Sequence, residues 1–311
     1  MEKIAKSDER ACFLDTSVSS KPVVSTLIDG FLEYARFDLN FSPNTIPKYR
    51  ELLGWFVRDV GDKPVSELTP QDFVTLKRKM MERGVGAARI TASIFAAKSF
   101  LRYCRTFLGI NTIDPKLIRP PKRPKREVIF LTKEEIEAFV NSIGTGTITD
   151  LRFRALVETI LGTGMRISEA LSLNRQDIEW QKKEANIIGK GNKQRRVFFT
   201  DRALTWIQKY LEARGDSNKA VFVTNGDIPR RLRPDDTWRV FARVKGKAKI
   251  DKKITPHILR HTVATNLVFN GCPIVHVKEI LGHERLDTTC KYYLGVDKEL
   301  AKKAHDEYLD L

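Results

Sequence analysis

The stretch Thr255-Pro256-His257-Ile258-Leu259-Arg260-His261 carries the strongest fold and site signals in the chain. A threonine followed by proline is typical of a helix start, because the hydroxyl caps free amides and proline fits the first turn. Asn270-Gly271 predicts the end of this helix. His257 then lies in the first turn, where amides and the helix dipole attract anions, and Arg260 follows one turn later on the same face. The pair is predicted to bind one phosphate; the alternative is a capped helix with surface polar residues.

A second candidate arginine occurs upstream, in Gly162-Thr163-Gly164-Met165-Arg166-Ile167-Ser168-Glu169. Glycines permit a tight backbone, so the sequence predicts that a helix breaks here and resumes at Arg166. Glu169 stands three residues later, where its carboxylate can brace the guanidinium. An ordinary structural ion pair is the alternative.

A hairpin that carries lysine is predicted further along the chain. Ala185–Ile188 and Arg195–Thr200 have the character of short strands, and Gly189-Lys190-Gly191-Asn192-Lys193 joins them. The segment lacks the spacing of a nucleotide-binding P-loop. A lysine at a glycine-rich turn can reach into a DNA groove, which makes Lys190 a candidate; an ordinary basic hairpin is the alternative.

The last motif is Leu281-Gly282-His283-Glu284-Arg285-Leu286-Asp287-Thr288-Thr289-Cys290-Lys291-Tyr292. Asp287 or Thr288 can cap a short helix that carries Tyr292. A single tyrosine most often packs or makes a hydrogen bond. Tyr292 therefore becomes a candidate nucleophile only through the order in which all these motifs occur.

The first half of the chain predicts a compact bundle of four helices. Residues 1–20 carry charges of both signs and are expected to form a flexible tail. Ser42-Pro43 and Thr69-Pro70 are each expected to open a helix. The expected helices are Val23–Asp38, one from Ser42 through Phe56, one from Thr69 to near Gly84, and Ala87–Phe107.

A proline-rich basic run, Arg119-Pro120-Pro121-Lys122-Arg123-Pro124-Lys125-Arg126, lies in a predicted linker, residues 116–130. The linker is a solvated spacer, a segment that crosses a DNA backbone, or both. In residues 131–311, Thr132 and Asp150 are expected helix caps. The predicted fold is mainly α with a small antiparallel β-sheet: an N-terminal helical bundle, residues 21–115, followed by a C-terminal mixed α/β domain.

Charge and cysteine content narrow the class of protein. The formal net charge is +16 and the pI is about 9.7. This charge favours a nucleic acid as the partner; the alternatives are a protein that binds anionic lipid and a basic protein with no polyanionic partner. No apolar run reaches the roughly 20 residues of a membrane span. Residues 1–20 contain no apolar stretch of the kind found in secretory signals, so they are not expected to be one. The cysteines stand far apart, which fits a reducing, cytoplasmic compartment without disulfides. They are Cys12, Cys104, Cys272 and Cys290.

The order of the motifs is more specific than any one of them. An arginine box, a lysine hairpin, His-x-x-Arg, Leu-Gly-His and a tyrosine nine residues after that histidine follow one another. This order closely resembles the tyrosine recombinase family, which includes Xer recombinases, phage integrases and transposon recombinases. The resemblance covers about residues 131–311 by motif, and the N-terminal half matches only in size and helical character, as a core-binding domain. It implies a site-specific recombinase acting on double-stranded DNA as a homo-tetramer on two sites, without metal, ATP or any other cofactor.

The resemblance also implies roles for individual residues. Tyr292 would attack the scissile phosphorus to form a covalent 3′-phosphotyrosine, and Lys190 would protonate the leaving 5′ oxygen. Glu169 matches the acidic residue that supports the first arginine, and Lys193 and Tyr293 are the nearby alternatives to the lysine and the tyrosine. The implied catalytic residues are Arg166, Lys190, His257, Arg260, His283 and Tyr292.

Several alternatives stay open at this point. Residues 296–311 predict a short amphipathic helix that docks on its own domain or on a neighbouring subunit. A non-enzymatic DNA-binding regulator and a topoisomerase-like enzyme are rival functions. A metal-binding module is a third, although its spacing matches no known finger. Its candidate ligands are Cys272, His276, His283 and Cys290.

Overall fold

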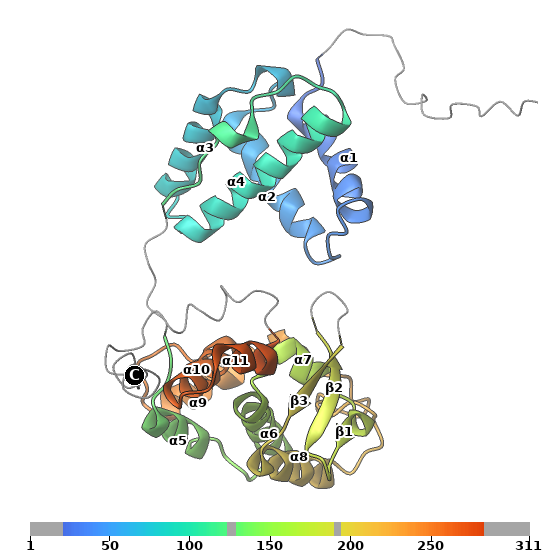
Figure 1. Cartoon of the computed structure of the whole chain (residues 1–311), viewed down its shortest axis with the longest axis vertical. Helices are drawn as coiled ribbons and strands as arrows, with labels where there is room; N and C mark the ends of the chain where they lie inside the picture. The colour runs from blue at the N-terminus through green and yellow to red at the C-terminus, as the bar shows by residue number, and fades with distance from the viewer. Residues whose placement is uncertain (1–20, 123–128, 190–193, 283–311) are drawn as a thin grey trace, which may run out of the picture. The chain divides into compact units, whose positions relative to one another are not determined.

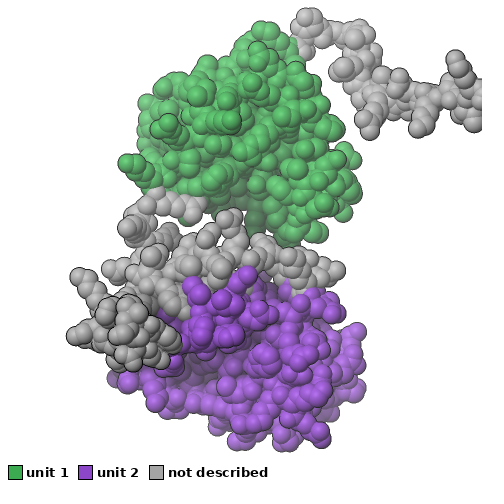
Figure 2. All heavy atoms as spheres, in the orientation of Figure 1, with its two compact units in different colours: residues 1–125 green, residues 126–311 purple. Residues whose placement is uncertain are grey.

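The chain forms two compact units, residues 1–125 and residues 126–311, which Figure 2 colours separately. The computed structural model describes residues 21–122, 129–189 and 194–282. The predicted N-terminal tail, Lys190, His283, Tyr292 and the C-terminal tail lie outside the described residues. The domain limits expected from the sequence stay predictions.

The first unit is a bundle of helices around an aromatic and aliphatic core. Four α-helices supply the core, and its fully buried side chains include Phe31, Leu53, Phe73 and Ile94. A π-helical turn extends α4, so the predicted helix Ala87–Phe107 is continuous but changes its winding. The elements are α1 (Val24–Phe37), α2 (Ile46–Val60), η1 (Val65–Glu67), α3 (Pro70–Glu82), α4 (Ala87–Arg102), η2 (Tyr103–Phe107) and η3 (Pro115–Leu117).

The two threonine- or serine-proline signals of this unit have different outcomes. Thr69 caps α3 as predicted, and its amide donates to Asp72 Oδ2 at 2.8 Å in a capping box. The start expected at Ser42 is wrong, because α2 begins at Ile46 with Pro47 in its first turn. Ser42 instead joins its hydroxyl to that of Thr45 at 2.8 Å across a preceding turn.

The second unit surrounds α6 with helices and a small sheet. In Figure 1, α6 lies at the centre of this unit, with the sheet on one side and α5, α9 and α10 on the other. Its large buried side chains include Phe139, Tyr210, Phe222 and Phe241. Among the described residues, no helix is long and apolar enough to cross a membrane. The helices are α5 (Lys133–Asn141), α6 (Ile148–Thr163), α7 (Ile167–Ser172), η4 (Arg175–Asp177), α8 (Asp201–Arg214), η6 (Pro234–Thr237), α9 (Trp238–Lys247), α10 (Pro256–Phe269) and α11 (Ile274–Leu281).

The sheet is antiparallel with the order β1-β2-β3. Its strands are β1 (Ile178–Glu179), β2 (Glu184–Ile188) and β3 (Gln194–Phe198). Ile188 pairs with Gln194, so residues 189–193 connect β2 to β3 as the hairpin prediction requires. β3 ends before Thr200 because the Thr200 hydroxyl caps α8. This mainly helical fold with a small antiparallel sheet confirms the predicted fold class.

The predictions for α6 need two corrections. Thr147, not Asp150, is the cap, and its hydroxyl accepts from the Asp150 amide at 3.1 Å. The helix also continues through Gly162 to Thr163. A Cβ at Gly162 would lie 2.6 Å from Thr200 Oγ1, so this glycine permits close packing of α6 on the start of α8 and does not break the helix. The helix ends at Gly164, which has a left-handed φ of +65°.

Candidate active site

Glu169 is the centre of an arginine cluster in the second unit. The Arg166 amide donates to Glu169 Oε2 at 2.9 Å, and Arg166 Nη1 donates to Oε1 at 2.7 Å. Arg195 Nη2, on β3, donates to Oε2 at 2.9 Å, and Arg260 Nη1, on α10, lies 3.8 Å from the same oxygen. The Glu169 side chain is only 4% exposed. One buried carboxylate therefore gathers arginines from three parts of the unit, and the predicted brace between Glu169 and Arg166 is confirmed.

The environment of Glu169 keeps it ionised. Burial by itself raises the pKa of this carboxyl. Hydrogen bonds from Arg166 and Arg195 and the charge of Arg195 outweigh burial, so the pKa of Glu169 lies below its ordinary value. The carboxylate is therefore negative at neutral pH.

The same three arginines also cap the C-terminal end of α11. Arg195 Nη1 donates to the Ile280 carbonyl at 2.8 Å, Arg260 Nη2 to the Leu281 carbonyl at 2.5 Å and Arg166 Nη2 to the Gly282 carbonyl at 3.2 Å. The last carbonyls of a helix lack partners within the helix and carry partial negative charge. The Leu281-Gly282 part of the last motif thus has a structural role, because its two carbonyls help to fix the guanidinium groups of Arg260 and Arg166.

Gly282 is required by backbone conformation and by space. Its φ is +62°, a region that residues with a Cβ rarely adopt. A Cβ at this position would also lie 2.5 Å from both Cδ and Nε of Arg195. Glycine therefore lets the end of α11 lie directly against the Arg195 side chain.

The cluster concentrates positive charge where water has limited access. The Arg260 side chain is 5% exposed, Arg195 14% and Arg166 34%. Among the described residues, three guanidinium groups share one carboxylate in this cluster. Excess charge in a partly buried site is unfavourable unless an anion approaches. The arrangement is therefore suited to binding an anion such as phosphate, with Arg166 nearest to solvent.

His257, in the first turn of α10, lies in the electrostatic field of Arg260 and Arg166. Thr255 caps this helix, and its hydroxyl accepts from the Ile258 amide at 3.2 Å. Burial and then the charges of Arg260 and Arg166 lower the pKa of His257. The imidazole also contacts His261, since their Nε2 atoms are 2.7 Å apart.

The described residues therefore bring together three of the six candidates from the sequence: Arg166, His257 and Arg260. Sequence reasoning missed Arg195 and assigned no role to His261. His261 stands four residues after His257, a spacing that predicts a helical neighbour. Nothing local singled out Arg195, because its partners lie on α7 and α11. The remaining candidates, Lys190, His283 and Tyr292, lie outside the described residues, as do their alternatives Lys193 and Tyr293.

The metal-site alternative has only two of its four ligands, Cys272 and His276, among the described residues. Within residues 21–122, 129–189 and 194–282, no group of three acidic, histidine or cysteine side chains is arranged to hold a metal ion.

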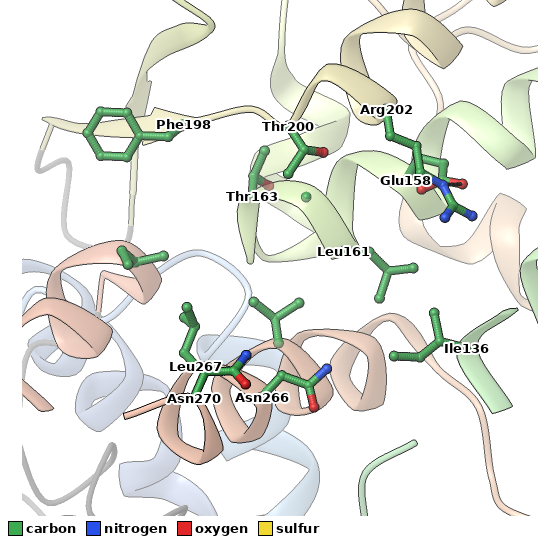
Figure 3. A pocket seen from close by; sticks show the side chains of 13 residues that line it. Ile136, Glu158, Leu161, Thr163, Phe198, Thr200, Arg202, Asn266, Leu267 and Asn270 are labelled. Atoms are coloured by element: carbon green, nitrogen blue, oxygen red, sulfur yellow. Dashed lines mark hydrogen bonds and ion pairs between the residues drawn. The ribbon is translucent and has the colours of Figure 1, made fainter. Parts of the chain in front are cut away.

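A pocket of about 450 Å³ lies between α6, β3, α10 and α11. Much of its lining is apolar, and two of its polar lining residues are bonded to each other, with Arg202 Nε donating to Glu158 Oε1 at 2.8 Å. Figure 3 shows Asn266 and Asn270 across the pocket from Thr163 and Thr200. Its described lining contains none of the three arginines, so it is a separate feature of the same unit.

Comparison with known proteins shows which family the chain belongs to. Residues 129–299, more than half of the chain, match the Phage integrase family. The chain belongs to this family. Tyrosine recombinase XerA of Pyrococcus furiosus is 32% identical over 282 residues, covering 90% of this chain and 93% of its own length. Tyrosine recombinase XerD of Yersinia pestis is 29% identical over 294 residues, covering 91% and 96%.

A solved structure supports the same fold assignment. The XerH site-specific recombinase, bound to palindromic difH substrate in a post-cleavage complex, has a TM-score of 0.71 and 22% identity and covers 90% of this chain and 84% of its own. The family and its Xer members confirm the predicted class: the chain is a Xer-like tyrosine recombinase, an enzyme that cleaves and rejoins DNA strands. The family assignment therefore argues against the alternative that the chain is a non-enzymatic DNA-binding regulator.

Proposed function

We propose that this recombinase acts on specific sites in double-stranded DNA, and that the arginine cluster around Glu169 activates the scissile phosphate. The observation that carries the proposal is the convergence of Arg166 and Arg260 on one buried carboxylate, although 94 positions separate them. Integration, excision and dimer resolution all require this chemistry.

The proposed reaction is a transesterification. The Tyr292 hydroxyl releases its proton to solvent as its oxygen forms a bond to phosphorus, the bond from phosphorus to the 5′ oxygen breaks, and Lys190 gives that 5′ oxygen a proton. Arg166 and Arg260 stabilise the extra charge on the non-bridging oxygens, because planar guanidinium groups suit two oxygens at once. His257 donates another hydrogen bond, and His283 positions the phosphate or the tyrosine.

The covalent 3′-phosphotyrosine conserves the energy of the phosphodiester. A 5′ hydroxyl from a second strand reverses the attack and rejoins DNA, and two such exchanges pass through a Holliday junction. No metal ion or nucleotide cofactor enters these steps.

Double-stranded DNA as the partner is supported by charge and by the relatives. The net charge of +16 favours phosphate contacts, each of which releases counterions. XerH was solved on its difH substrate. The basic linker between the two units would follow the DNA backbone.

A homo-tetramer on two DNA sites completes the proposal. Residues 297–311 would dock on a neighbouring subunit, and the apolar pocket of Figure 3 offers a concave surface for such a segment. A chain without residues 297–311 would then bind one site but fail in two-site synapsis and strand exchange. If the truncated chain recombined DNA at the full rate, the proposed docking of residues 297–311 on a neighbouring subunit would be contradicted.

The direct test is covalent trapping. The substrate is recovered by incubating the chain with nicked duplexes of random sequence and sequencing the DNA that stays attached on a denaturing gel. Tyr292→Phe should abolish the covalent band and spare binding, since only one oxygen is lost. The matched control, Tyr293→Phe, should still form it. A band that survives in Tyr292→Phe would assign the attack to Tyr293 or another group.

Topoisomerase activity is the remaining rival. A topoisomerase would relax a supercoiled plasmid at many sequences, whereas the proposed recombinase requires the recovered site and exchanges strands between two copies of it. Relaxation without any dependence on the site would favour the rival.

A further inference from the structure

His261 has a defined relation to the proposed site that the reaction above does not use. It follows His257 by one turn of α10, and the two Nε2 atoms are 2.7 Å apart. The imidazole planes are nearly perpendicular, at 88°, with ring centroids 4.1 Å apart. At this distance one nitrogen must donate a proton and the other must accept it.

Both rings favour the neutral form. Burial, followed by the charges of His257 and Arg260, lowers the pKa of His261 to about 4. Burial and the charges of Arg260 and Arg166 lower the pKa of His257 as well. At neutral pH the pair therefore has two possible arrangements, which differ in the ring that donates through Nε2.

Only one arrangement suits a phosphate. If His257 donates through Nε2, its Nδ1 carries a lone pair and repels a phosphate oxygen. If His261 donates, the proton of His257 stands on Nδ1, and that nitrogen can donate to the phosphate. His257 Nε2 is already engaged by His261, so Nδ1 is the nitrogen left for the DNA.

We propose that His261 is a positioning residue that holds His257 in the tautomer with its proton on Nδ1, so that His257 can donate a hydrogen bond to the scissile phosphate. The inference rests on the proposed function, because it gives the phosphate contact to His257. His261 itself touches His257 and not the DNA.

The test compares two amides at position 261. Glutamine places an amide nitrogen near the position of Nε2, whereas the shorter asparagine reaches only as far as Nδ1. Single-turnover cleavage of the recovered nicked duplex should be roughly tenfold slower in His261→Asn, the effect of losing one ordinary hydrogen bond. His261→Gln should remain within about threefold of the original chain. Equal rates in the two variants would overturn the proposal.

A double substitution separates positioning from stability. If His261 acts through His257, then His261→Asn should cause no further loss in a His257→Ala background. The same tenfold loss in that background would assign His261 a purely structural role and overturn the proposal. Melting temperatures of all variants report any general loss of folding. Failure of the proposed function would look different, since the original chain would then form no covalent complex that depends on Tyr292.

Discussion

Both units bury a carboxylate among arginines, Asp59 in the first and Glu169 in the second, but the arginines around these two carboxylates differ in exposure and in partners. In the first unit, Arg83 gives Nη1 and Nη2 to the two oxygens of Asp59 at 2.6 and 2.5 Å, and Arg58 adds a bond of 3.0 Å. These arginines are 38% and 54% exposed, so water solvates their charge. Both also lie over the Trp55 ring. This site fastens the end of α3 to α2.

In the second unit, the guanidinium groups around Glu169 are divided between the carboxylate and the end of α11. Arg260 and Arg195 are 5% and 14% exposed, so water screens their charge much less. An arginine that makes two hydrogen bonds to one carboxylate and is open to water attracts a second anion only weakly. In the second unit, three guanidinium groups share one carboxylate and otherwise bond to neutral carbonyls, so the cluster keeps net positive charge that attracts another anion. Between these two sites, the exposure of the arginines and the geometry of their partners differ more than the number of arginines does.

The largest expected effect follows from removing an arginine at each site. Arg260→Ala should slow cleavage of the recovered duplex by about 10³-fold, because a preorganised donor to the transition state is lost. Arg83→Ala should leave the cleavage step within about threefold. A comparable loss of the cleavage rate in both would show that the two sites do not differ as described.

Replacing each carboxylate with the matching amide should give the next largest difference between the two sites. Glu169→Gln leaves three guanidinium groups, two of them largely buried, without their shared negative charge. We expect cleavage to be about 100-fold slower and the free energy of unfolding of the second unit to fall by about 3 kcal/mol. Asp59→Asn should ease unfolding of the first unit by about 2 kcal/mol and leave the cleavage step unchanged. Hydrogen exchange followed by mass spectrometry assigns each change to its unit.

How far the sequence predicts these features depends on the range of the interactions. Thr255-Pro256 and Thr132 predict their helices correctly, because capping is local. The same logic fails at Ser42-Pro43, since a second proline four residues later also fits a first helical turn. β1 has two residues and shows no alternation to detect.

The active site divides in the same way. Arg166 and Glu169 are three residues apart, so their contact can be predicted, whereas Arg195 reaches Glu169 only through the packing of β3 against α7 and α11. Gly162 illustrates the reverse error. Its lack of a side chain serves packing against Thr200, which no local pattern distinguishes from a helix break.

A pair of left-handed glycines provides a smaller test. Gly282→Ala strains a φ of +62° and brings its Cβ against Arg195, so cleavage should fall roughly tenfold through displaced guanidinium groups. Gly84→Ala strains a similar φ of +71° but meets no atom within 4 Å. It should ease unfolding of the first unit by about 1 kcal/mol and leave cleavage unaffected. Equal cleavage rates for the two variants would mean that the contact with Arg195 is unimportant.

Lowering the pH should give the smallest difference between the two sites, and it is seen in the free energy of unfolding. Bonds from Arg83 and Arg58 lower the pKa of Asp59, and bonds from Arg166 and Arg195 overcome burial to lower that of Glu169. A depressed carboxyl pKa stabilises the fold above the unfolded value of about 4, and this contribution is lost as the pH falls through the folded value. The stability gaps between the original chain and Glu169→Gln or Asp59→Asn should therefore narrow below about pH 4. Urea unfolding at pH 6 and pH 3.5 measures them, and constant gaps would contradict the assigned ionisation.

The central claim is that the cluster around Glu169 neutralises charge on the scissile phosphate. A methylphosphonate at that position replaces one charged oxygen with a methyl group, so a guanidinium has less charge to stabilise. On this neutral substrate, Arg260→Ala should cleave within about tenfold of the original chain, against a deficit of about 10³ on ordinary phosphate. An undiminished deficit on methylphosphonate would contradict the claim and leave Arg260 a structural role at the end of α11.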